Sequence, residues 1–218
     1  MHPIHIIRNL MVKNRDSAHS RCTILDQGTE NILAISPDAK FIDSNLTIHG
    51  SNNQITLGAG TYQNLRITLL GNDSKIIIGK QLRLTNTAVV IASGKGFLHI
   101  GDSTTCEGAE ITIHEPSSIL IEEDCMISAG VQIVTSDGHS ILDKQSGKRI
   151  NPASDIKIGK HTWLGNGVRV GKGAHIAANT IVGARSLVLG AFLQEHTIIA
   201  GTPAKIKKTE VTWTRQLL

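Results

Sequence analysis

Between residues 158 and 187 the chain repeats every six residues. An aliphatic residue opens each unit, at Ile158, Leu164, Val170, Ile176 and Val182. Glycine or alanine follows it, and the fifth position is always small. This pattern is typical of short strands that turn a corner every six residues, with one aliphatic side chain pointing inward on each face. Three such faces close one coil, and because a single coil cannot bury its inner face, coils must stack. The sequence therefore predicts an all-β fold, a parallel β-helix.

A looser version of the repeat continues upstream. The stretches ITLG, IIIG and LHIG end at Gly58, Gly79 and Gly101, which are 21 and 22 residues apart. We therefore expect the β-helix to occupy residues 46–208. Residues 1–45 are expected to form an N-terminal segment or cap, because an open end would expose unpaired strand edges. Residues 209–218 are expected to form a C-terminal tail that covers the other end.

Composition narrows the class of protein. Aromatic residues make up only 3% of the chain, which favours a narrow core of Ile, Val, Leu, Ala and Thr. The net charge of +4 is too small to indicate nucleic-acid binding, but it is compatible with an anionic polymer or a phosphate-bearing ligand. Three widely spaced cysteines fit a reducing compartment, and Cys106 and Cys125 are expected in the core. No stretch is long and apolar enough for a membrane span, so we expect a cytoplasmic protein.

The repeat is interrupted once, by residues 134–155. This segment is rich in Ser, Asp, Lys and Arg, and it contains the stretch SDGHSI. Such side chains cannot enter a narrow apolar core. We therefore expect an excursion loop outside the coils, with its charged residues Asp143, Lys144, Lys148 and Arg149 in solvent. His161 and His175, at outward positions of the repeat, are also expected in solvent.

The motifs resemble those of the hexapeptide-repeat acetyltransferases. The resemblance rests on the six-residue units, on SDGHSI, on IGKHTWLGNGVRV and on IIAGTPAKIKK. It is nearest to the galactoside, maltose, xenobiotic and capsular-polysaccharide O-acetyltransferases. The resemblance implies that the β-helix is left-handed, that the protein is a homotrimer, and that acetyl-CoA is the donor, with no metal.

The resemblance also implies site residues. His139 matches the catalytic histidine of the family, carried by the loop into a cleft between subunits. An imidazole is suited to take the proton from a hydroxyl at neutral pH. Asp137 is a candidate to orient that ring, although the family often uses a backbone carbonyl. Trp163 matches the tryptophan beside the acceptor and the thioester, and it could also pack between subunits.

Matching motifs assign six residues to acetyl-CoA: Gly165, Asn166, Gly183, Ala184, Lys205 and Lys208. The family binds the pantetheine arm largely through backbone groups, and the two lysines match basic residues that meet the nucleotide phosphates. The chain departs from the family pattern at Arg185, where glycine is usual, and in the stretch LGAFLQEH.

The predicted function is O-acetylation of a carbohydrate hydroxyl, on a bacterial capsule, lipopolysaccharide or sialic-acid polymer. The alternative acceptor is a drug of the streptogramin or chloramphenicol type. A carbonic anhydrase of similar fold is rejected, because that family needs two histidines five positions apart and no pair here has that spacing. A non-catalytic scaffold is disfavoured by the loop that carries SDGH.

Overall fold

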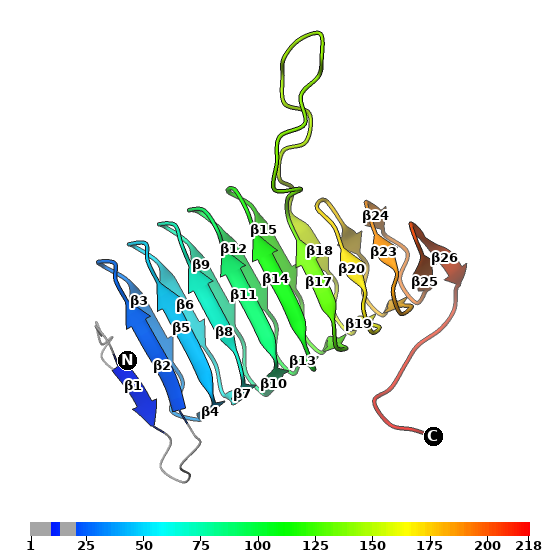
Figure 1. Cartoon of the computed structure of the whole chain (residues 1–218). Helices are drawn as coiled ribbons and strands as arrows, with labels where there is room; N and C mark the ends of the chain where they lie inside the picture. The colour runs from blue at the N-terminus through cyan, green and yellow to red at the C-terminus, as the bar shows by residue number, and fades with distance from the viewer. Residues whose placement is uncertain (1–9, 14–20) are drawn as a thin grey trace.

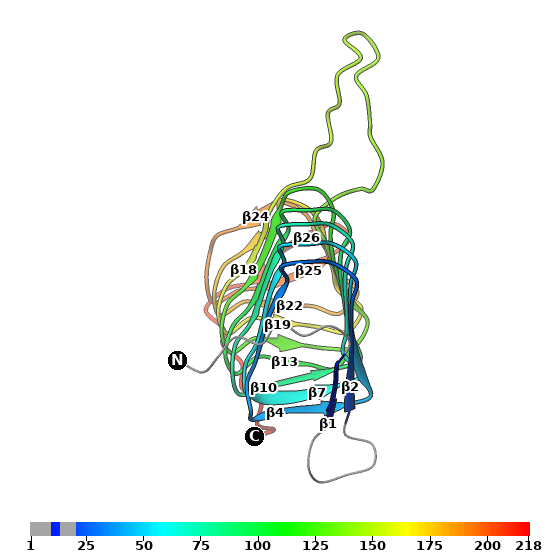
Figure 2. The same cartoon turned by 90° about the vertical axis from the view of Figure 1, so that its left-hand side faces the viewer.

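The computed structural model describes residues 10–13 and 21–218. These residues form three long sheets that run side by side as the faces of a triangular prism (Figures 1 and 2). Strands β2 to β25 make eight coils, each contributing one strand to each face, and consecutive coils pair in parallel. The described residues contain no helix. The chain is thus a β-solenoid, as the six-residue repeat predicts.

The strands divide among the three faces as follows. The first face holds β1 (Leu10–Lys13), β2 (Arg21–Asp26), β5 (Ser44–Ile48), β8 (Arg66–Leu69), β11 (Thr87–Ile91), β14 (Ala109–Ile113), β17 (Val131–Val134), β20 (Arg169–Val170) and β23 (Leu187–Val188). The second holds β3 (Ile32–Ile35), β6 (Gln54–Leu57), β9 (Lys75–Ile78), β12 (Phe97–Ile100), β15 (Ser118–Ile121), β18 (Ile156–Ile158), β21 (His175–Ile176) and β24 (Ala191–Phe192). The third holds β4 (Ala39–Ile42), β7 (Gly60–Gln63), β10 (Leu82–Thr85), β13 (Thr105–Cys106), β16 (Met126–Ile127), β19 (Trp163–Leu164), β22 (Ile181–Val182), β25 (Ile198–Gly201) and β26 (Ala204–Lys208).

The core is a single column of aliphatic side chains inside the prism. Buried and outward residues alternate along most of the strands from β2 to β25, so each coil adds aliphatic side chains to the column. The only large rings in it are Phe41 and Tyr62, stacked with centroids 5.0 Å apart in the first two coils. Cys22, Cys106 and Cys125 are buried in the same column, as expected for the latter two, and burial raises the pKa of Cys125 to about 12.

Coils before the loop are longer than those after it. Paired residues lie 22 residues apart at Ala88 and Glu110, but 18 apart at Arg169 and Leu187. The longer coils turn their corners with residues in the left-handed conformation, such as Asn64 and Asn86, at φ of 52° and 46°. Asparagine tolerates this conformation better than most residues. The side chain of Asn64 also donates to that of Asn86 in the next coil, at 2.8 Å.

The coils begin earlier than the sequence indicates. Residues 21–42 form the first complete coil, although they lie within the 1–45 segment expected as a cap. The reason is that this coil keeps the buried–exposed alternation of a strand without the six-residue pattern. Strand β1 pairs antiparallel with β2 and covers its edge. The rest of the expected cap, residues 1–9 and 14–20, lies outside the described residues.

The C-terminal end also differs from the expectation. Strand β26 turns back and pairs antiparallel with β25, so the parallel coils end at residue 201 instead of 208. Residues 209–218 do not cover the end of the solenoid but run back along it (Figure 1). In the described part of the chain, no helix is long and apolar enough to cross a membrane.

Candidate active site

Residues 135–155 leave the solenoid as one protruding arm, at the edge where the first and second faces meet (Figures 1 and 2). The two limbs of the arm run antiparallel. The amide of Ile150 donates to the carbonyl of Ile141 at 2.9 Å, and the amide of Asp143 donates to the carbonyl of Lys148 at 2.8 Å. His139 lies exposed on the first limb. Within the described residues no hydrogen bond joins its imidazole to another group, so the ring faces solvent.

The backbone around His139 is fixed by one asparagine. The side chain of Asn151 is buried, with 6% of the residue exposed. Its Nδ2 donates to the carbonyl of His139 and to Asp137 Oδ2, both at 2.8 Å. Its Oδ1 accepts the amide of Ile141 at 2.6 Å. The side-chain amide of Asn151 therefore holds the chain on both sides of His139. Both of its Nδ2 hydrogens and its Oδ1 are hydrogen-bonded, as is usual for a buried polar group.

Asp137 does not contact the His139 ring. Its carboxylate accepts hydrogen bonds from Lys172 Nζ at 2.6 Å and from Asn151. The hydrogen bond from Lys172, and then that from Asn151, hold the pKa of Asp137 below its usual value. Lys172 lies in the corner after β20, so this ion pair attaches the base of the arm to the next coil. The geometry gives Asp137 a role in holding the arm.

A second attachment joins the arm to the preceding coil. Arg149 was expected in solvent, but its two terminal nitrogens donate to both oxygens of Glu115, at 2.6 and 2.7 Å. Glu115 also accepts the hydroxyl of Ser136. The hydrogen bond from Arg149 is the main cause that lowers the pKa of Glu115 to about 2. A bidentate pair of this kind restricts orientation as well as distance, so it fixes the direction of the arm.

Trp163 lies on the third face. It stands on β19 between Met126 of the preceding coil and Ile181 of the following one. The indole is half-buried, and its Nε1 donates to Ser128 Oγ at 3.2 Å. This hydrogen bond ties the ring to the corner that follows β16 in the preceding coil.

The residues assigned to acetyl-CoA gather around Trp163. Gly165, Gly183 and Ala200 follow one another in successive coils, and a Cβ added at Gly183 would lie 2.8 Å from Ala200 Cβ. They form a strip along the third face on which no side chain exceeds a methyl group. Asn166 and Ala184 stand at its edge, where Asn166 Nδ2 donates to the Ala129 carbonyl at 2.9 Å. Lys205 and Lys208 lie exposed on β26, at the end of the strip.

The predicted site residues thus fall into two groups. His139 and Asp137 belong to the arm, at the edge between the first and second faces. Trp163 and the donor residues belong to the third face, which lies opposite that edge (Figure 2). One chain does not bring the two groups together. A site that uses both must combine the arm of one copy with the third face of another.

A groove of about 670 Å³ runs along the first face from the base of the arm. Ser136 and Asp137 line one end of it. Three basic side chains line the rest, those of Arg169, Lys172 and Arg185. Because Asp137 is already paired with Lys172, the groove presents excess positive charge to any bound group.

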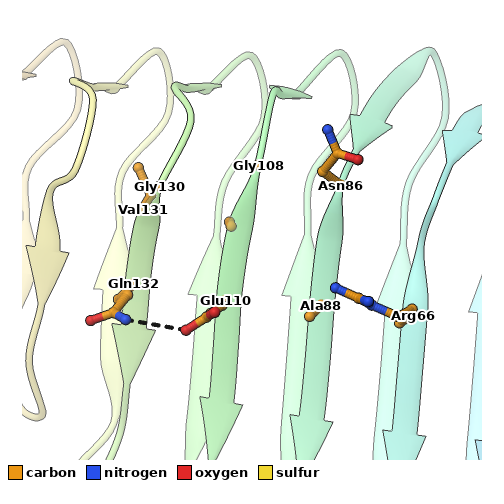
Figure 3. Close-up of a pocket in the computed structure, with 9 residues that line it drawn as sticks. Arg66, Asn86, Ala88, Gly108, Glu110, Gly130, Val131 and Gln132 are labelled. Atoms are coloured by element: carbon orange, nitrogen blue, oxygen red, sulfur yellow. Dashed lines mark hydrogen bonds between the residues drawn. The ribbon is translucent and has the colours of Figure 1, made fainter.

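A second, smaller hollow lies on the same face. It has a volume of about 250 Å³ and lies over small residues such as Ala88 and Gly108 (Figure 3). Arg66 reaches over it on one side, and on the other Gln132 donates to Glu110 at 3.1 Å. It contains none of the predicted site residues. Across residues 10–13 and 21–218, no group of three His, Cys, Asp or Glu side chains is arranged to hold a metal ion.

Comparison with known proteins agrees with the six-residue repeat. The family model described as "Bacterial transferase hexapeptide (six repeats)" matches residues 155–190. A polysialic acid O-acetyltransferase of Neisseria meningitidis is 34% identical over 193 residues, which cover 88% of this chain and 89% of that protein. The chain belongs to the hexapeptide-repeat acetyltransferases. The resemblance predicted from its motifs is thereby confirmed, and the protein is an acetyltransferase.

Solved structures of hexapeptide-repeat acetyltransferases share the fold over most of the chain. The crystal structure of the polysialic acid O-acetyltransferase OatWY matches with a TM-score of 0.87 at 32% identity, over 89% of this chain and 92% of that one. The polySia-specific acetyltransferase NeuO matches with a TM-score of 0.80 at 28% identity, over 89% of both chains. The left-handed parallel β-helix expected from the motifs is confirmed as the fold.

Sequence reasoning missed the residues that hold the acetyltransferase arm in place. Asn151, Glu115 and Lys172 carry no local motif, since their partners lie 12 to 35 residues away. The sequence does contain one indication of these anchoring contacts. An arm that leaves a rigid solenoid needs anchors at its base, and a Glu at a corner with an Arg near the end of the excursion is a suitable pair.

Replacing Glu115 with glutamine is expected to loosen the arm at neutral pH, because Arg149 loses its bidentate partner. We expect faster protease cleavage between residues 137 and 150, with little change in the thermal midpoint of the solenoid. In the wild type, the folded pKa of Glu115 is about 2 against an ordinary 4.5. Its contribution is therefore present above pH 4.5 and lost as the pH falls through about 2. Equal cleavage rates for wild type and variant at pH 7 would contradict the anchoring role.

Proposed function

We propose that the protein transfers acetyl from acetyl-CoA to a hydroxyl of an anionic bacterial surface polysaccharide, with a sialic-acid polymer as the first candidate. The observation that carries this proposal is the 34% identity, over 88% of the chain, with a polysialic acid O-acetyltransferase. Two solved relatives, OatWY and NeuO, are also named as acetyltransferases of polysialic acid. A drug acceptor finds no comparable support among these relatives.

His139 is proposed as the general base. Its imidazole takes the proton from the acceptor hydroxyl as the oxygen attacks the thioester carbonyl. The carbon–sulfur bond then breaks, and the imidazolium returns the proton to the departing thiolate. Acetyl passes directly to the acceptor, so no acyl-enzyme forms. The hydrogen bonds of the Asn151 side chain to the His139 carbonyl and from the Ile141 amide support this role, because they hold the backbone that carries the ring in a defined position.

The third face is proposed as the donor surface. Its strip of Gly165, Gly183 and Ala200 carries no side chain larger than a methyl group, so a narrow chain can approach the backbone there. The pantetheine arm of acetyl-CoA has that shape. Lys205 and Lys208, beyond the end of the strip, are suited to meet the nucleotide phosphates. Trp163, beside the strip, would then lie next to the thioester and the acceptor.

The basic groove on the first face is proposed as part of the acceptor surface. Arg169, Lys172 and Arg185 line it, and the base of the arm forms one end. A polymer with one carboxylate per sugar unit would be attracted along such a groove. A neutral oligosaccharide would gain nothing from these charges. Charge complementarity therefore favours an anionic polymer among the carbohydrate acceptors.

A homotrimer is proposed as the working form. The arm of one copy would meet the third face of its neighbour, which unites His139 with Trp163. The arm carries the exposed apolar side chains of Ile141, Leu142 and Ile150, at 53%, 57% and 61% exposure, and these are suited to contact a second copy. A cytoplasmic location is also inferred, because three unpaired, buried thiols fit a reducing compartment.

The experiment that tests the function is release of free thiol from acetyl-CoA across a panel of acceptors. The panel contains sialic-acid polymers, neutral oligosaccharides, a streptogramin and chloramphenicol. We expect release that depends on the anionic polymer and falls with rising ionic strength, because the groove charges are screened. Release stimulated by a drug and not by any polysaccharide would favour the alternative acceptor.

A further inference from the structure

The C-terminal residues 211–215, here called the strap, run along the edge between the second and third faces. They begin at His196, where the amide of Val211 donates to its carbonyl at 3.1 Å. They then cross His161 and end at Asp124, moving back towards earlier coils. All three of these residues are corner residues with left-handed φ values of 51° to 57°. The strap thus follows one column of corners down the solenoid.

Trp213 is the buried residue of the strap. Only 9% of it is exposed, although the strap has no regular secondary structure. Its ring stacks on His161 with centroids 4.2 Å apart and an interplanar angle of 10°. Trp213 Nε1 donates to the His161 carbonyl at 2.9 Å, and His161 Nε2 lies 3.2 Å from the Trp213 carbonyl. Two reciprocal hydrogen bonds and a stacked ring pair define one position for this indole.

Arg215 fixes the strap beyond Trp213. Its guanidinium donates to the Asp124 carboxylate and, at 3.1 Å, to the carbonyl of Cys125. It also lies over the Trp213 ring, 5.2 Å from the centroid. Asp124 receives His161 Nδ1 at 2.6 Å on its other oxygen. His161, the corner histidine expected in solvent, is therefore partly covered: Trp213 stacks on its ring and Asp124 bonds its edge, and 26% of the side chain stays exposed.

Trp213 also contacts Trp163 of the proposed site. The rings of Trp213 and Trp163 lie 6.1 Å apart and are tilted by 49°. Ser128 holds the Nε1 of Trp163, and Trp213 contacts the same ring system from the edge of the prism. These two contacts act on Trp163 from different elements. Together they restrict the orientation of the Trp163 ring, and with it the direction in which the exposed face of that ring points.

We propose that Trp213 is a positioning residue of the acetyl-transfer site, which acts by fixing the orientation of the Trp163 ring. The inference rests on the proposed function, in which Trp163 lies beside acceptor and thioester. An aromatic partner at a fixed tilt favours one orientation of an indole over others. The strap is suited to impose that tilt because it is bonded to three corners of a rigid solenoid, those of Asp124, His161 and His196.

The test compares Trp213→Ala with Trp213→Phe and with Thr212→Ala, an exposed neighbour in the strap, as the matched control. We expect the alanine variant to lose about three- to tenfold in kcat/KM for the acceptor, the range expected for loss of one aromatic contact. Phenylalanine keeps the stacked ring and should retain most of the activity. Arg215→Ala, which frees the strap without altering either indole, should give a smaller loss in the same direction.

Fluorescence separates this role from a merely structural one. The chain has two tryptophans, so Trp163 is the only emitter in the Trp213 variants. In Trp213→Ala, we expect Trp163 emission to be quenched more readily by acrylamide than in Trp213→Phe, at an unchanged thermal midpoint. Unchanged kinetics in Trp213→Ala, or altered kinetics without any change in Trp163 quenching, would overturn the inference. Two further results separate this inference from the proposed function. Full activity in Trp163→Ala would contradict the place of Trp163 beside the thioester, whereas a wild type that transfers no acetyl to any acceptor would contradict the proposed function itself.

Discussion

Replacing His139 with alanine is expected to lower kcat by about 10²- to 10⁴-fold, the range for loss of a general base. The KM for acetyl-CoA should change little. The reason is geometric, because His139 stands on the arm whereas the proposed donor strip lies on the opposite face. Initial rates of thiol release, with the sialic-acid polymer as acceptor, measure both parameters.

The matched control is Ser140→Ala, which removes a neighbouring exposed side chain of the arm and leaves the imidazole in place. It should keep wild-type rates. Calorimetry with CoA should give the same affinity for the wild type and His139→Ala. Turnover close to wild type in His139→Ala would remove this residue from the chemistry and leave the proposed mechanism without a base.

Mixing two inactive variants is expected to restore activity. In His139→Ala the third face is intact, and in Trp163→Ala the arm is intact. If each site of a trimer combines the arm of one copy with the third face of the next, random assembly of equal amounts makes about one quarter of the sites fully wild type. Co-expressed and co-purified with separate tags, the mixture should therefore recover about a quarter of wild-type turnover.

Each variant assembled alone provides the baseline for that experiment, and the double variant co-assembled with wild-type chain provides a check on assembly. Sites that lie within one chain would give no recovery, since every copy then carries a defect. If properly mixed trimers recovered no activity, a site shared between copies would be contradicted, even if both residues proved essential.

Sequence reasoning reaches those features that repeat or that match a motif. The six-residue period predicts the coils around Leu164 and Val182 because the same inward position recurs in each. The polar excursion predicts an arm outside the core, and His139 lies on it. The glycines at 165 and 183 align on one face because the period sets their register. In each case a local rule suffices.

The remaining features depend on contacts between distant parts of the chain. His161 was expected in solvent because its outward position predicts exposure, yet Trp213, 52 residues further on, covers it. Arg215 meets Asp124 across 91 residues. The first coil, residues 21–42, lacks the six-residue pattern because its longer strands need only alternate buried and exposed side chains. Such pairings carry no signature in a single sequence.

The separation of His139 from Trp163 could not be predicted from their spacing of 24 residues. That spacing spans most of the arm and two corners of the prism. Only the topology shows that residues 139–163 lead the chain from one edge of the prism to the opposite face. The family resemblance implies a cleft between subunits, and the topology supplies the geometric reason, since one chain does not bring these two residues together.

The most direct measurement follows the acetyl group itself. The protein is incubated with acetyl-CoA labelled in the acetyl carbon and with a sialic-acid polymer, and the polymer is then isolated and its label located by NMR. The proposal predicts an acetyl ester on a sugar hydroxyl of the polymer, formed by the wild type and not by His139→Ala. Label that stays in acetyl-CoA or appears only as free acetate, in the presence of a folded trimer, would contradict it.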